Sequence, residues 1–84
     1  MSAWKWTRID ITTDGSILNQ RTMTVDEDQA KTDFARLRKG YAGWQVIKST
    51  PRYLFAMNDN QLGNWAGVAV AFVVYRKARK GEEE

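Results

Sequence analysis

The chain of 84 residues contains no histidine and no cysteine. Histidine is the usual general base and a frequent metal ligand, and cysteine supplies the most nucleophilic side chain, so catalytic triads built on either residue are excluded. Disulfides and thiolate metal sites are excluded as well. We therefore expect a protein that is not an enzyme and that has no cofactor and no metal.

The sequence also lacks a long hydrophobic run and a strong charge of one sign. Its net charge is +3, a small excess that does not by itself predict nucleic-acid binding. The N-terminus has no apolar secretory signal, which predicts a cytoplasmic protein. The longest apolar segment, 65–75, would span only about 16 Å as a helix, roughly half of a bilayer core, so we expect no membrane anchor.

What the chain does contain is aromatic bulk. It has four Trp, three Tyr and three Phe residues. A domain of this size buries only about 60–65% of the surface that its extended chain exposes, so these rings must supply much of the core. We expect a single domain over residues 1–80, followed by a disordered acidic tail at 81–84.

The N-terminal part predicts a β-hairpin. Residues 4–13 and 16–24 are rich in β-formers, and Asp14-Gly15 between them is a strong turn dipeptide.

A helix of about fifteen residues is expected next. It starts either with the capping box Thr24–Glu27 or two residues later, at Asp26 with Gln29. Gly40 is suited to the left-handed conformation that ends such a helix. Apolar residues recur at the spacing of one helix face, at Ala30, Phe34, Leu37 and Tyr41.

The remaining chain predicts strands at 44–50, 52–57 and 68–75, with a mobile polar loop at 58–64. The last segment is apolar at both alternating sets of positions. This pattern is typical of a strand covered on both faces, with a short buried helix as the alternative.

These elements indicate an α+β fold, with an antiparallel sheet of about five strands in β-β-α-β-β-β order and one helix packed on one face. One helix cannot cover both faces of such a sheet. The other face then needs a partner subunit, a ligand or curling of the sheet.

Strict alternation places Trp4, Trp6 and Arg8 on one face of the first strand, and Ile9 and Ile11 on the other. Either a bulge near Thr7 or Arg8, or a curved sheet, places both tryptophans in the core, or Trp4 and Trp6 lie on the face away from the helix as an apolar patch.

We expect a small binding module that contacts a host protein through this aromatic sheet face, with a homodimer as a further form of protein partner. Single-stranded nucleic acid, bound by aromatic stacking and basic residues, is the alternative. The residues expected to bind the partner are Trp4, Trp6, Arg8, Arg52, Tyr53, Tyr75, Arg76 and Lys77.

The helix end at 37–41, the run Gly43-Trp44-Gln45-Val46-Ile47 and the closing run 72–77 resemble a family of small bacterial and phage domains of unknown function. The resemblance covers about half of the chain, and Gly-Trp is its one specific motif. It implies a helix, a Gly-Trp entry into the next strand and a terminal strand with a basic end, but no activity. Accessory proteins of bacteriophages have a similar size and often bind host components, so a phage origin is part of this expectation.

Overall fold

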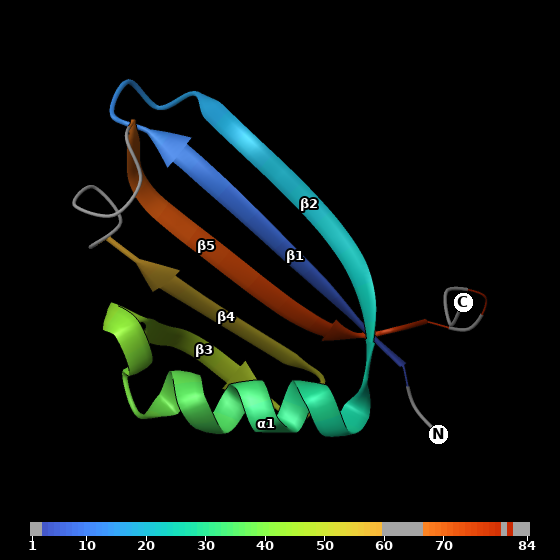
Figure 1. Ribbon diagram of the computed structural model, residues 1–84. Coiled ribbons are helices and arrows are strands. Elements are labelled where there is room, and N and C mark those ends of the chain that lie inside the picture. The colour runs from blue at the N-terminus through green and yellow to red at the C-terminus, as the bar shows by residue number, and fades with distance from the viewer. Residues whose placement is uncertain (1–2, 60–66, 80, 82–84) are drawn as a thin grey trace.

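The computed structural model describes residues 3–59, 67–79 and 81. The described elements are β1 (Ala3–Thr12), β2 (Ile17–Asp26), α1 (Glu27–Arg38), a 3-10 turn η1 (Tyr41–Gly43), β3 (Gln45–Thr50), β4 (Tyr53–Asn58) and β5 (Val68–Lys77). All five strands belong to one antiparallel sheet, so the α+β class is confirmed (Figure 1).

Neighbours in the sheet do not follow the order of the chain. The strands lie in the order β2-β1-β5-β4-β3, which makes the C-terminal strand the central one. β1 pairs with β5 along its whole length, from Trp4 opposite Lys77 to Thr12 opposite Val68. On the helix side of β5, Val73 and Tyr75 are buried, whereas Phe72 and Val74 on the opposite side are only half-buried.

The β1–β2 hairpin closes at Asp14-Gly15, as predicted. Gly15 has φ 86°, and its N–H donates to the carbonyl of Thr12 at 3.0 Å. The Asp14 carboxylate accepts hydrogen bonds from the Thr12 hydroxyl and from the Ser16 N–H, and these bonds lower the pKa of Asp14. A three-residue loop with glycine in the left-handed region is one of the common hairpin connections.

Helix α1 starts at the later of the two predicted positions. The Asp26 carboxylate accepts a hydrogen bond from the Gln29 N–H at 2.7 Å, so Asp26 is the N-cap, while Thr24 stays in β2. The helix therefore has twelve residues instead of about fifteen. Gly40 follows it with φ 73°, the left-handed conformation expected there.

The core lies between α1 and the sheet. Phe34 stands edge-on between two rings of the sheet, 5.3 Å from Trp4 and 5.2 Å from Tyr75, measured between ring centroids. Together with Ala30 and Leu37 of the helix, these rings belong to one buried cluster. Leu54, Ala56 and Val73 complete it from β4 and β5.

The tryptophans of β1 lie on the helix side, as the core alternative predicted, so their placement away from the helix is wrong, and so is the bulge near Thr7 or Arg8. β1 keeps an unbroken register until Asp10, so Trp4 and Trp6 lie on the helix side without any bulge. Trp4 is 2% exposed. Ile9 and Ile11 take the opposite face. The two apolar sets coexist because β1 is an interior strand of the sheet.

Two predictions fall partly outside the described residues. The predicted loop starts at Asn58, but Asn58 belongs to β4, where it is fully buried and donates to the Ala42 carbonyl at 2.9 Å. The rest of that loop beyond Asp59, and the acidic tail beyond Gly81, lie outside the description. Within the described ranges, no helix is long and apolar enough to cross a membrane.

Candidate functional site

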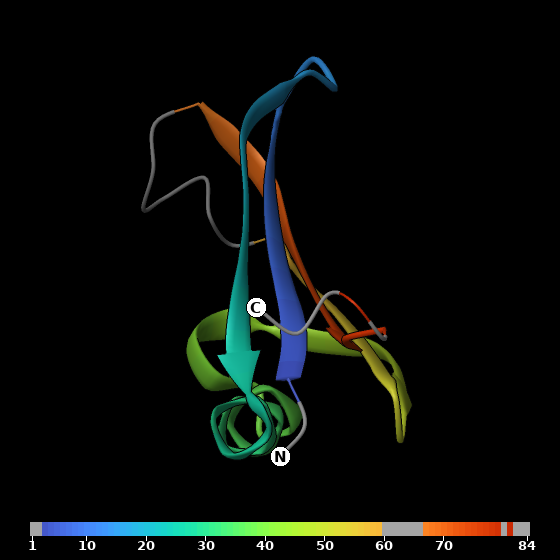
Figure 2. The same ribbon diagram turned by 90° about the vertical axis from the view of Figure 1, so that its right-hand side faces the viewer.

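The sheet face that points away from α1, called the outer face below, is defined by the register of the strands (Figure 2). Its residues are Lys5, Thr7, Ile9 and Ile11 of β1; Gln20, Thr22 and Thr24 of β2; Gln45, Lys48 and Thr50 of β3; Tyr53, Phe55 and Met57 of β4; and Val70, Phe72, Val74 and Arg76 of β5.

The centre of the outer face is aromatic and aliphatic. Phe55 and Phe72 stack almost parallel, with ring centroids 5.5 Å apart and an interplanar angle of 7°. Tyr53 continues the aromatic row along β4, and the Lys48 ammonium lies 5.6 Å from the centre of its ring. All four side chains belong to the outer face, and the three rings are partly accessible. The arrangement offers a row of π-surfaces on adjacent strands.

Charges on the outer face have one sign. Its charged members are Lys5, Lys48 and Arg76, all basic. Lys5 donates to the Thr24 hydroxyl at 2.8 Å, which holds its ammonium over β2. Many of the carboxylates of the described chain lie elsewhere, for example in the first turn of α1 at Glu27 and Asp28. The outer face therefore favours anionic groups.

A groove at one end of the outer face adds further basic residues. We call it the basic groove; its volume is about 510 Å³. It is lined by Arg52, Tyr53, Arg76, Lys77, Ala78 and Arg79. Two backbone hydrogen bonds assemble it: Lys77 N–H donates to the Arg52 carbonyl at 3.0 Å, and Ala78 N–H donates to the Ala3 carbonyl at 2.9 Å.

The first bond joins the turn between β3 and β4 to the end of β5, and the second joins the chain just after β5 to the start of β1. They bring the basic run that closes the chain next to Arg52, which lies far from it in the sequence. Tyr53 is shared between the basic groove and the outer face, so the cationic lining passes directly into the aromatic row.

Four of the eight predicted partner-binding residues meet in this groove: Arg52, Tyr53, Arg76 and Lys77. The other four lie on the helix side of the sheet. Trp4 is in the core, Trp6 packs against that core, and Tyr75 is 5% exposed. Arg8 pairs with the buried Asp10, whose carboxylate is 3.1 Å from the Arg8 Nε atom. The single surface that was expected from all eight residues does not form.

Tyr75 links β5 to α1. Its hydroxyl donates to the Asp33 carboxylate at 2.6 Å, and the Gln29 amide donates to the other oxygen of Asp33 at 2.9 Å. Burial, followed by this hydrogen bond and the negative charge of Asp33, raises the pKa of Tyr75 above its ordinary value of 10.0. The contact is thus part of the helix–sheet packing.

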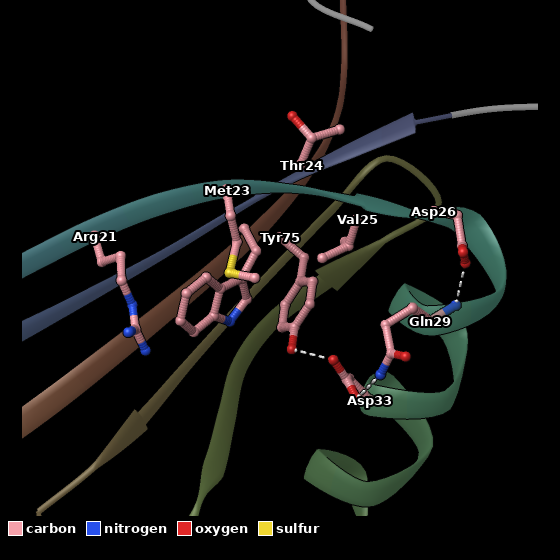
Figure 3. A pocket seen from close by; sticks show the side chains of 9 residues that line it. Arg21, Met23, Thr24, Val25, Asp26, Gln29, Asp33 and Tyr75 are labelled. Atoms are coloured by element: carbon pink, nitrogen blue, oxygen red, sulfur yellow. Dashed lines mark hydrogen bonds between the residues drawn. The ribbon is translucent and has the colours of Figure 1, made fainter. Parts of the chain in front are cut away.

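A second groove lies on the helix side, between β2 and α1, with a volume of about 560 Å³. Arg21, Met23 and Val25 point toward it from β2, whereas Thr24 points away (Figure 3). The carboxylates of Asp26 and Asp33 accept hydrogen bonds from Gln29 there (Figure 3). This strand–helix groove thus combines an apolar wall, formed by Trp6, Met23 and Val25, with the Arg21 side chain and the hydrogen-bonded groups of α1.

Sequence reasoning missed Phe55, Phe72 and Lys48 as candidate binding residues. Period-2 alternation places Phe55 on one face of β4, but only the pairing of β4 with β5 shows that Phe72 stacks on it. The position of Lys48 depends on the register shift between Val46 and Lys48, which no sequence signal indicated.

Among the described residues, no group of three or more acidic side chains is placed to hold a metal ion. Comparisons with protein-family models, curated proteins and solved structures found no match to the chain. The resemblance to small bacterial and phage domains therefore stays a prediction.

Proposed function

We propose that the protein is a binding module without catalytic activity, and that its ligand is single-stranded nucleic acid held on the outer face and in the basic groove. The observation that carries the proposal is the direct junction of four basic side chains with an aromatic row through Tyr53. Phosphates bind in the groove at Arg52 and Lys77, and bases stack on Tyr53, Phe55 and Phe72.

The physical basis is that of sheet-based single-strand binders. Unpaired bases stack on exposed aromatic rings, each stack contributing about 1–3 kcal/mol, while cations along the path contact the backbone. Every base has a π-face, so this mode needs no sequence readout. A duplex hides its bases, which is why an open sheet with partly accessible rings favours single strands.

A titration of a fluorescently labelled single strand, followed by anisotropy, tests the proposal. The variant Arg52→Gln/Lys77→Gln removes two exposed cations of the basic groove and should weaken binding strongly. Its matched control, Lys31→Gln/Lys39→Gln, lowers the net charge equally at exposed positions of α1 and its C-cap. The control should bind like the natural protein. Equal losses in both variants would mean a non-specific charge effect and would contradict the proposal.

A second pair of variants tests the aromatic part. Tyr53→Leu keeps apolar bulk beside the groove but removes the π-surface, so binding should weaken. Tyr41→Leu makes the same change at a tyrosine that is 63% exposed and lies in η1, and it should have no effect. If Tyr53→Leu binds as tightly as the natural chain, stacking on this row is not the mode of binding.

A host protein on the outer face, the partner expected from the sequence, is the second candidate. It is favoured by the aliphatic side chains between the rings, Ile9 and Val74 among them, which nucleic acid does not require. If the ligand is a protein, Tyr53→Leu should lower the affinity less than Val74→Asp does, because the affinity would then come from burial of apolar area. A cytoplasmic location and a phage origin also stay proposals.

A further inference from the structure

The two edges of the sheet are unequal. β3, at one edge, has six residues, and its register with β4 shifts between Val46 and Lys48. It carries Lys48, and Pro51 follows it directly. Short length, a bulge, a lysine and a nearby proline are the features by which sheet proteins prevent pairing with another chain. The β3 edge is protected.

The β2 edge has fewer of these protections, and its one register shift lies near its start, between Ile17 and Asn19. It has ten residues, and its register with β1 is continuous from Asn19 to Asp26. It contains no lysine and no proline, and before Asp26 its one charged residue is Arg21. Three of the five large hydrophobic residues exposed in the described chain lie on it: Ile17 at 59%, Leu18 at 55% and Met23 at 48%. In the described part of the chain, no strand pairs with its far side.

The strand–helix groove runs beside this edge. Met23 and Val25 form part of its apolar wall, and the polar groups of α1 that line it bond one another (Figure 3). The apolar wall of the groove therefore provides room for apolar side chains of a strand added to β2. Backbone pairing and side-chain burial would occur together at the same edge.

We infer that β2 is a homodimer interface, which pairs antiparallel with β2 of a second copy of the chain. The charge pattern of the strand is what selects a second copy. Arg21 lies in the middle of β2, while Asp26 ends it and Glu27 and Asp28 follow. Antiparallel pairing turns Arg21 of each copy toward the acidic end of the other, so the edge is complementary to itself.

This geometry has a consequence for the whole assembly. The two-fold axis is normal to the sheet, so the two five-stranded sheets join into one continuous sheet with both outer faces on the same side. Met23 of each copy lies near that axis. A charged side chain at this position would therefore be buried next to the same charge of the other copy. The inference does not rest on nucleic-acid binding.

Sedimentation equilibrium of the full chain, without nucleic acid, tests this interface. The natural protein should have the mass of two 9.7-kDa chains. Met23→Lys should reduce the mass to one chain. Ile47→Lys places the same charge at a residue that is 53% exposed on the protected edge strand β3, and it should leave the dimer intact. Circular dichroism of both variants verifies that the fold is kept.

A second variant keeps the test independent of Met23. Arg21→Glu brings two acidic groups together across the interface and should also give a single chain. A natural protein that sediments as one chain would overturn the inference. A dimer that survives both Met23→Lys and Arg21→Glu, or one that dissociates only with Ile47→Lys, would place the interface elsewhere and overturn it equally.

Discussion

At the scale of single residues, the contact between Tyr75 and Asp33 is the best-defined polar link between the sheet and the helix. The tyrosine is 5% exposed, and its hydroxyl lies 2.6 Å from the carboxylate. A hydrogen bond to a charged acceptor in a partly buried site is stronger than one between neutral groups. The protonated form of Tyr75 is therefore part of the native structure.

Tyr75→Phe should lower the free energy of unfolding by about 1.5 kcal/mol at neutral pH, because it removes this bond. The pKa of Tyr75 is raised in the folded state above 10.0. As the pH rises above about 10, the unfolded chain releases this proton while the folded chain retains it, so stability falls. The stability difference between the natural chain and Tyr75→Phe should therefore shrink above pH 10.

Urea denaturation at neutral pH and above pH 10 measures this difference. Tyr41→Phe, at a residue that is 63% exposed, is the matched control and should leave the midpoint unchanged at neutral pH. A difference that grows with rising pH would contradict the assigned role of the Tyr75 hydroxyl.

At the scale of elements, one ring of α1 contacts two strands of the sheet. Phe34 makes edge-on contacts with both Trp4 and Tyr75, which come from the adjacent strands β1 and β5. Edge-to-face aromatic pairs add about 0.5–1.5 kcal/mol beyond the burial of their area. Among the described residues, Trp4 also has the one buried side-chain polar atom without a hydrogen-bond partner, its indole Nε1.

Trp4→Ala should reduce the free energy of unfolding by about 3–5 kcal/mol, a large part of the margin of a small domain. Trp4→Phe should cost clearly less, because it keeps a ring against Phe34 and loses an N–H that has no partner. Urea denaturation followed by circular dichroism compares the three proteins. If Trp4→Ala were as stable as the natural chain, the packing described for this residue would be wrong.

The elements themselves were predictable because their signals are local. Asp14-Gly15 closes a hairpin, Asp26 offers a capping oxygen to the N–H that donates to it three residues later, and Gly40 takes a left-handed conformation. Each of these depends on a few neighbouring residues.

The faces of the strands were harder to predict because they depend on long-range pairing. Alternation puts Trp4 and Ile9 on opposite faces of β1, but it does not say which of the two faces the helix. The answer comes from the placement of β5 between β1 and β4. The basic groove has the same origin, since a backbone bond brings Lys77 to Arg52 across many residues of sequence. The proposed site therefore combines residues that the sequence predicted with a face that it did not.

At the scale of the whole molecule, the two faces of the sheet have different chemistry. The helix side holds the core, with Trp4 and Tyr75 buried in it. The outer face carries the aromatic row, its charged residues are all basic, and the basic groove lies at its end. Although the net charge is only +3, basic side chains are concentrated on one face of the molecule. This separation, more than the total charge, is the basis of the proposed binding of single strands.

The salt dependence of single-strand binding tests the central claim most directly. If all four cations of the basic groove contact phosphates, the logarithm of the binding constant should fall with the logarithm of salt concentration with a slope of about −3. For Arg52→Gln/Lys77→Gln the slope should be about half of that. A natural chain that gives no anisotropy change with a labelled single strand at about 50 mM salt, where such contacts are strong, would contradict the account.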